Sequence, residues 1–193
     1  MWSHILGEAM EGPLKGKDLK IIPADMLTWA AWKKEHPKTT VLNLRRTGRA
    51  YTRAFYQDPH RFVYGFEGAG GVFHCSLGTL KKQPIINASA GGLPRLIAFD
   101  PQSTSIRLFD RRVGEQTLSF EARGPRLMRD RETGSYWRRT TGMALEGPLK
   151  GKKLTVEAGI ISFAHAWKTF HPDSEEVRAD DRKANNGATR KAG

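Results

Sequence analysis

The sequence contains little cysteine and no long hydrophobic segment. Cys75 is the single cysteine among 193 residues, which excludes an internal disulfide and a metal cage built from several thiolates of this chain. Because no run of about 18 apolar residues is present, the sequence predicts no transmembrane segment. The opening MWSHILGEAMEGP lacks the basic start, apolar stretch and small-residue cleavage site of a signal peptide.

Acidic residues are also few, with 20 Asp and Glu against 32 Lys and Arg and a formal net charge of +12. The acids show no spacing typical of a paired acid and base, and neither a nucleophile elbow nor a zinc motif is present. The sequence therefore predicts no catalytic residue and no cofactor. Its 38% hydrophobic content is sufficient for a core.

The positive charge is concentrated in residues 107–139, which hold nine arginines and five acidic residues. Such a density could mark a face that binds phosphate groups. Strands with one solvated face produce the same composition, and we prefer that interpretation because no helix-turn-helix or RNP-like aromatic pattern accompanies it. Nucleic acid is therefore not an expected partner.

The main feature of the chain is an internal repeat. With an offset of 135 residues, residues 2–37 align without a gap to residues 137–172, and 16 of the 36 positions are identical, including the whole string EGPLKGK. Two copies are too few for a solenoid, so they indicate two related half-domains. The second copy follows the segment LMRDRETGSY, which predicts a strand, a tight turn at Thr133-Gly134 and a return strand.

Each copy is expected to end in a short helix, over residues 24–35 with Asp25 as a possible cap and over residues 160–170. The region between them favours strands, including a hairpin of residues 106–111 and 117–121 that bends at 113–115. Residues 72–80 suit a strand and a short turn. The glycine-rich stretches at 65–71 and 87–94 are typical of loops.

Together these patterns predict a β-rich α+β fold with two half-domains of short strands in a bent sheet or half-barrel, each with one small packed helix. We expect a single domain over residues 1–172, divided into a first repeat unit (2–42), a central β-rich region (43–128) and a second repeat unit (129–172). The polar residues 173–193 are expected to form a disordered tail.

These motifs resemble a bacterial and archaeal family, domain of unknown function 3179, with the recurring text DR.TGS.W, then G.A..GPL.G..L, then W...HP. The resemblance covers nearly all of residues 2–172, in two partial copies. Because the first copy begins at Trp2 without a preceding hairpin, we expect an N-terminally truncated or degenerate member. The resemblance implies an extracytoplasmic protein, although no signal peptide is present.

Departures from the family pattern decide the expected site. Where the family commonly has two thiols around a loop, this chain has Asp100 and Ser103, and an aspartate and a serine cannot perform redox exchange or bind soft metals. We expect a ligand cleft near this loop, with Asn87, Asp100, Ser103 and Ser105 as candidate binding residues for a small-molecule or anionic ligand.

Other reactive residue types have structural explanations that we prefer. Cys75 beside His74 could be an activated nucleophile, yet neighbours on a strand point to opposite faces, so we expect a buried thiol. His36 and His171 are weak metal candidates, and we interpret each His-Pro pair as a helix stop. The five tryptophans are expected in the core.

We therefore expect a non-catalytic binding or structural module whose family thiol loop is lost. The first alternative is a thiol-redox or metal-linked protein that acts through Cys75 and the histidines. The second alternative is polyanion binding by the arginine-rich 107–139 region, which predicts an affinity that falls steeply with salt.

Overall fold

The computed structural model describes residues 1–3, 6–20, 22–24, 26–41 and 58–179. The expected cap Asp25, the end of the first repeat unit, the start of the central region and residues 180–193 lie outside this part. The fold is α+β and rich in strands, as predicted. None of the described helices is long and apolar enough to cross a membrane.

In the described part of the chain, the strands form three four-stranded sheets and one small ribbon, rather than one bent sheet. In hydrogen-bonding order, the first sheet contains β13 (Ile160–Phe163), β1 (Phe62–Gly68), β2 (Gly71–Ser76) and β14 (Glu175–Glu176). The second contains β12 (Val156–Glu157), β5 (Ser105–Asp110), β4 (Leu93–Asp100) and β3 (Ile85–Ala90). The third contains β11 (Ala144–Glu146), β10 (Tyr136–Arg138), β9 (Leu127–Asp130) and β8 (Phe120–Arg123), and the ribbon pairs β6 (Arg112–Val113) with β7 (Gln116–Thr117).

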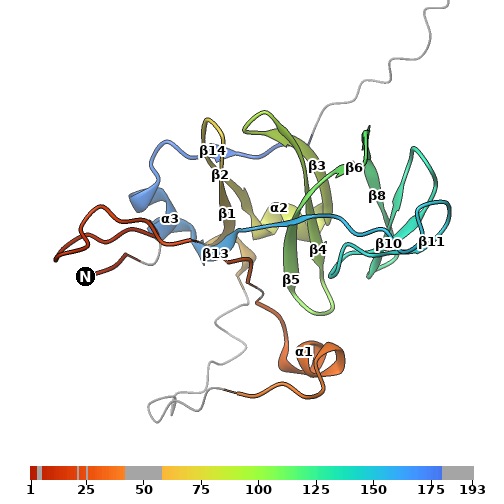
Figure 1. The fold of residues 1–193 in the computed structure, drawn as a ribbon, viewed down its shortest axis with the longest axis horizontal. Helices are drawn as coiled ribbons and strands as arrows, with labels where there is room; N and C mark the ends of the chain where they lie inside the picture. The colour runs from red at the N-terminus through yellow and green to blue at the C-terminus, as the bar shows by residue number, and fades with distance from the viewer. Residues whose placement is uncertain (4–5, 21, 25, 42–57, 180–193) are drawn as a thin grey trace, which may run out of the picture.

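The second sheet lies between the other two, as Figure 1 shows from side to side. Alternate residues of its strands enter two separate cores: Ile86 and Ile97 pack toward the first sheet, whereas Ile85 and Leu96 pack toward the third. Burial on both faces explains why the sequences LIAF and IRLF are nearly continuous apolar runs instead of alternating ones.

The stretch at residues 87–94 is a hairpin, and its prediction as a loop was wrong. It contains the end of β3 and the start of β4, joined by Gly91 and Gly92 with φ of 60° and 71°. Positive φ at both positions is the geometry of the tightest hairpin turn. The small residues that suggested a loop serve the core instead, since Ala88 and Ala90 are buried in it.

The glycines at 65–71 also belong largely to strands rather than to the expected loop. Gly65 pairs with His74 inside the β1–β2 hairpin, and a Cβ added to Gly65 would lie 2.2 Å from the Trp167 ring. The glycine therefore permits close packing of a side chain on the strand.

The predicted hairpin at residues 106–121 was only partly right. Its bend at Gly114 is present, with φ of 61°, but the flanking strands have other partners. β5 pairs with β4 and β12, and β8 pairs with β9. The β6–β7 ribbon therefore connects the second sheet to the third. β8 joins a separate sheet that covers one face of β5, instead of pairing with β5 in a hairpin.

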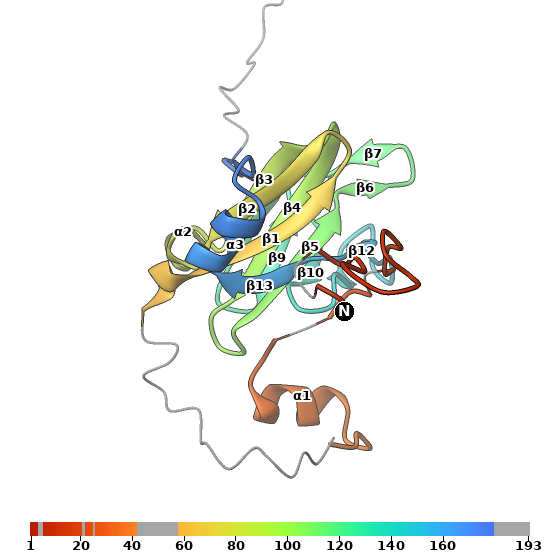
Figure 2. The same cartoon turned by 90° about the vertical axis from the view of Figure 1, so that its left-hand side faces the viewer.

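The helices are shorter than the sequence predicted. Residues 160–163 form β13, and α3 (Ala164–Phe170) follows and crosses the outer face of β1 and β2 (Figure 2). In the first unit α1 (Trp29–Glu35) begins after the cap Thr28 and has no buried residue, and it stands apart from the sheets in Figures 1 and 2. The expectation of a packed helix in each half therefore holds for α3 only.

Residues 77–82 form the helix α2 (Leu77–Lys82) where a turn was expected, capped by the Ser76 hydroxyl, which accepts from Thr79 N at 3.0 Å. The short 3₁₀ helix η2 (Pro59–Arg61) precedes β1.

The described start of the expected tail is ordered. Residues 175–176 pair in parallel with β2, and Val177 is buried in the first core, so residues 173–179 are not part of a disordered tail. The apolar Val177 within a polar stretch is the signal that could have shown this. The division of the chain into one domain with two repeat units stays a prediction.

The two EGPLKGK stretches fold into the same turn. Gly12 and Gly147 have φ of 94° and 92°, a region that favours glycine. Each turn is closed by three corresponding backbone hydrogen bonds: Lys15 N to Gly12 O, Gly16 N to Ala9 O and Lys17 N to Leu14 O in the first unit, and Lys150 N to Gly147 O, Gly151 N to Ala144 O and Lys152 N to Leu149 O in the second.

Candidate functional site

The loop between β4 and β5 brings three of the four expected binding residues together. Asp100, Ser103 and Ser105 are 3%, 5% and 2% exposed. Asp100 accepts hydrogen bonds from the Ser103 hydroxyl at 2.7 Å and from Gln102 N at 2.9 Å. These acceptor sites are used within the loop, which makes Asp100 the organiser of a tight turn.

Neighbouring segments close this loop from outside. Thr28 N, just before α1, donates to Ser103 O at 2.9 Å. The buried Arg139 donates to Phe99 O at 3.1 Å; burial lowers the pKa of its guanidinium, and the Asp100 carboxylate partly opposes this by raising it. The loop therefore has the contacts of a structural corner.

Asn87 lies elsewhere on the second sheet. It pairs with Leu96, four residues before Asp100 and thus about 13 Å away along the strand. Its amide accepts from Phe120 N at 2.8 Å and donates to Phe120 O at 2.7 Å, which attaches β8 to β3. The structure does not bring Asn87 and Asp100 together.

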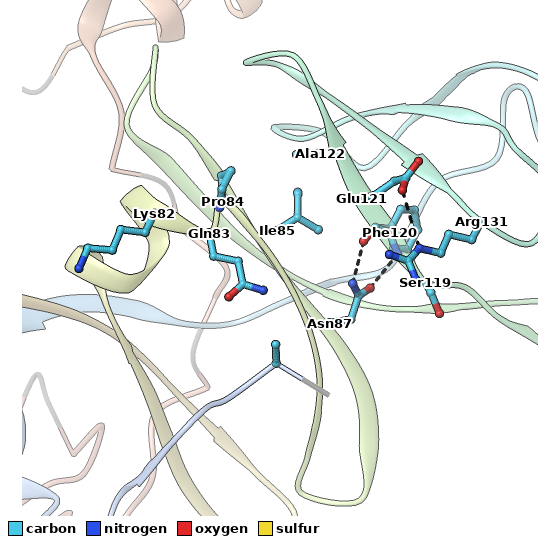
Figure 3. Close-up of a pocket in the computed structure, with 11 residues that line it drawn as sticks. Lys82, Gln83, Pro84, Ile85, Asn87, Ser119, Phe120, Glu121, Ala122 and Arg131 are labelled. Carbon is cyan, nitrogen blue, oxygen red and sulfur yellow. Dashed lines mark hydrogen bonds and ion pairs between the residues drawn. The ribbon is translucent and has the colours of Figure 1, made fainter. Parts of the chain in front are cut away.

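Asn87 instead borders a hollow of about 390 Å³ between the end of α2, β3 and β8. Figure 3 shows Gln83 and Arg131 on opposite sides of it with Asn87 between them, while Lys82 points away. The remaining lining comes from residues in or next to β3 and β8 and from the segment after β14: Pro84, Ile85, Ser119, Phe120, Glu121, Ala122 and Ala179. No sequence motif singles out Gln83, and Arg131 is one of nine arginines in the arginine-rich segment.

The hollow has a positive rim. Glu121 of the lining forms an ion pair with Arg123 and lies 3.9 Å from Arg129 and 3.8 Å from Arg131. Arg131 lines the hollow, whereas Arg123 and Arg129 lie next to it, as does the carboxylate of Glu132, which contacts Ser119. Three guanidinium groups thus stand against two carboxylates, and the excess favours an anion nearby.

Ser119 forms part of the hollow wall and is 3% exposed. Its backbone N–H donates to Glu132 Oε2 at 2.7 Å, whereas its buried hydroxyl has no hydrogen-bond partner among the described residues. Buried hydroxyls usually have a partner, so this position can accept a polar group from a bound molecule or from water.

Cys75 and His74 point to opposite sides of β2. Cys75 is fully buried in the first core, and burial, with a smaller contribution from Glu176, raises the pKa of its thiol to about 12. His74 lies on the outer side, with Nδ1 3.1 Å from the Ser174 hydroxyl. The pair therefore does not form a nucleophile and base.

The two histidines after the tryptophans end their helices. His36 N donates to Trp32 O and His171 N to Trp167 O, both at 2.8 Å. Each ring also lies against its tryptophan, with ring centroids 4.1 Å apart in the first unit and 4.3 Å in the second. Across the described residues, no group of three or more His, Cys, Asp or Glu is arranged to hold a metal ion.

A second hollow, of about 530 Å³, lies between α1 and Arg107 of β5 and includes His36.

The tryptophans of the two units differ in burial. Trp137 and Trp167 are buried, as predicted, whereas Trp2 and Trp29 are 37% and 51% exposed. Trp32 is half-buried and belongs to neither core, so the prediction of core positions for Trp2, Trp29 and Trp32 was wrong.

The DRETGSYW segment forms the predicted strand, turn and return strand, with Trp137 opposite Met128. Asp130 is fully buried and accepts from the Trp137 indole at 2.8 Å and from Gly134 N at 3.2 Å. Ser135 accepts from Leu149 N at 3.1 Å. The motif therefore joins the hairpin to the EGPLKGK turn, and its residues have structural tasks.

The comparisons with known proteins agree with this architecture. No curated protein and no solved structure matches the chain. The family model DUF3179, described as a protein of unknown function, matches residues 1–76 and again residues 75–189, so that each match contains one EGPLKGK turn. The chain therefore belongs to the DUF3179 family, of which it carries two partial copies.

Proposed function

We propose that the chain is a non-catalytic binding module that holds a small anion, of the carboxylate or phosphate class, in the hollow beside Asn87. The observation that carries this proposal is the charge at the hollow, where three guanidinium groups stand against two carboxylates, Glu121 and Glu132. The hollow's volume of about 390 Å³ is within the range of roughly 300–1,000 Å³ common for ligand sites.

The polar groups around the hollow suit an anion. Arg131 lies 3.8 Å from Glu121, which is too long for a hydrogen bond, so its donors can turn to a ligand at small cost. Gln83 offers an amide N–H from the opposite side (Figure 3). Arginine presents paired donors that match a carboxylate or phosphate.

The thiol-redox alternative is disfavoured by the surroundings of Cys75. Its raised pKa, about 12, leaves little thiolate at neutral pH, and the thiolate is the reactive form. The binding proposal itself fails if the protein shows catalytic turnover that disappears in the Asp100→Ala variant.

The proposal can be tested by calorimetric titration with phosphate and with citrate. We expect 1:1 binding that weakens about tenfold or more in Arg131→Ala, because one charge-assisted contact contributes roughly 1.5–3 kcal/mol. Gln83→Ala should weaken binding less. Arg138→Ala is the matched control, since it removes the same charge from the third sheet without altering the hollow.

Two results would contradict this site. Affinity for both anions that is unchanged in Arg131→Ala would place binding elsewhere. Equal losses in Arg131→Ala and Arg138→Ala, together with tight binding of a DNA or RNA strand that falls steeply with salt, would support the polyanion alternative instead.

A further inference from the structure

The first and second units present the same turn in different surroundings. In the second unit β10, which carries Trp137, lies between β11 and the β8–β9 hairpin, and Ser135 contacts the turn through Leu149 N. Trp137 is fully buried there, with its indole N–H on Asp130 and its ring at a right angle to Phe120, 5.7 Å away. Leu154 is 2% exposed.

The corresponding side chains of the first unit lie open to solvent. Trp2, which aligns with Trp137, is 37% exposed, and Leu19, which aligns with Leu154, is 48% exposed. Leu14 is 50% exposed, whereas its counterpart Leu149 packs against the second core. Leu14 lies in the turn, Leu19 follows the turn, and Trp2 is bridged to Ala9 just before the turn; apolar patches on a surface often mark sites of interaction.

The backbone of the first unit is already arranged as it is in the covered unit. Trp2 forms a bridge with Ala9, just as Trp137 pairs with Ala144. In the second unit the other side of Trp137 pairs with Met128 of β9. An added strand beside Trp2 would therefore continue a pairing that the first unit has begun.

We propose that this face of the first unit docks a two-stranded β-hairpin from a partner polypeptide, of the type formed by β8 and β9. The partner supplies a carboxylate that accepts the Trp2 indole N–H and an apolar face that covers Leu14 and Leu19. A hydroxyl after its turn takes the place that Ser135 has beside Leu149 in the second unit. This inference is independent of the anion site.

The covered unit shows why such a hairpin would bind this face in preference to an arbitrary apolar surface. A buried indole N–H needs an acceptor, because an unsatisfied donor costs about 1–3 kcal/mol. In the second unit Asp130 meets this need at 2.8 Å. A docked surface without a carboxylate or carbonyl opposite Trp2 would leave that donor without a partner.

The test uses the full chain and a synthetic peptide that reproduces residues 118–135, LSFEARGPRLMRDRETGS. We expect 1:1 binding by calorimetry, accompanied by a blue shift of tryptophan emission that is lost in the Trp2→Phe chain. The affinity of a peptide with Asp130→Ala should be about tenfold lower, because the indole loses its acceptor. Leu14→Ser and Leu19→Ser in the chain should weaken binding similarly.

Phe170→Ser is the matched control, because Phe170 is 45% exposed on α3 and lies outside this face; its affinity for the peptide should equal that of the unaltered chain. Absence of binding at millimolar peptide, or binding that is indifferent to Trp2, Leu14 and Leu19, overturns the proposal. Self-association of the chain that Leu14→Ser and Leu19→Ser abolish would show that a second copy covers this face instead.

Discussion

Asp130 illustrates how a family motif can be explained by a single buried carboxylate. Its two oxygens accept from the backbone N–H groups of Thr133 and Gly134, from the Thr133 hydroxyl and from the Trp137 indole. Each of these residues therefore appears in DRETGSYW because it donates to, or shapes the turn around, one acid. The motif preserves a corner of the fold.

We predict that Asp130→Asn lowers the free energy of unfolding by about 3 kcal/mol, because the amide nitrogen would face N–H groups that need an acceptor. Urea denaturation measures the change. Asp173→Asn, at an exposed position, should be within about 0.5 kcal/mol of the unaltered protein. A loss below about 1 kcal/mol for Asp130→Asn would mean that the carboxylate is not the organiser of the hairpin.

The residues that the sequence singled out were predicted with uneven success. The structure brings Ser103 and Asp100 together, since both belong to one short turn. It separates Asn87 from them, because Asn87 pairs with Leu96, four residues before Asp100 along β4. Arg131 lies at the hollow because β8 pairs with β9. The composition of an arginine-rich segment does not reveal this pairing.

Among the elements, α3 depends on a short chain of polar contacts at its base. Trp167 covers Gly65 of β1 and donates its indole N–H to the Ser174 hydroxyl at 3.1 Å, and Ser174 in turn contacts His74 Nδ1. These contacts connect α3, β2 and the segment before β14. The pKa of His74 is lowered, mainly by burial and less by Lys168, while Glu176 acts in the opposite direction.

Because the folded protein disfavours protonated His74, we predict that this part of the stability is complete above pH 6.5, the unfolded pKa, and is lost as the pH falls from there toward the lower folded pKa. Melting temperatures between pH 8 and pH 5 measure it. His74→Gln should reduce the slope, whereas His165→Gln, at an exposed position, should leave it unchanged. An unaltered slope in His74→Gln would assign the titration to another group.

Elements formed by local signals were the ones that the sequence predicted correctly. The β9–β10 hairpin was expected from its Thr-Gly turn, and the bend at Gly114 from its glycine. Residues 160–163 were expected to be helical but form a strand, because pairing with β1, far away in sequence, outweighs their local pattern. The helix predicted over residues 24–35 is also shorter in the structure, because α1 has no buried face that would stabilise a longer helix.

At the scale of the whole molecule, both cores are built without the first unit. The buried residues of the two hydrophobic clusters all lie after residue 61. Among the described residues, the first unit is hydrogen-bonded to the rest by Thr28 N with Ser103 O and by the Thr140 hydroxyl with Glu35. The sequence repeat suggested two related half-domains, and their unequal burial follows from the layers that surround each copy.

We predict that a variant lacking residues 1–41 folds cooperatively, with a melting temperature within about 5 °C of the full chain, because it loses roughly 1 kcal/mol of contacts. Differential scanning calorimetry measures this. The shorter deletion of residues 173–193 should cost more, since it removes β14 and buried Val177. The reverse order would show that the first unit supports the cores.

The position of the strands at the sheet edges has a consequence for how the protein forms during synthesis. Phe62 pairs with Phe163, and Phe109 pairs with Val156, so the first and second sheets each wait for a strand that is synthesised long after β1 and β5. Until then β1 and β5 expose unpaired edges beside apolar surface, a state that favours aggregation. A molecule with such distant pairings should fold slowly and benefit from a chaperone that shields β1 until residues 156–163 have been synthesised.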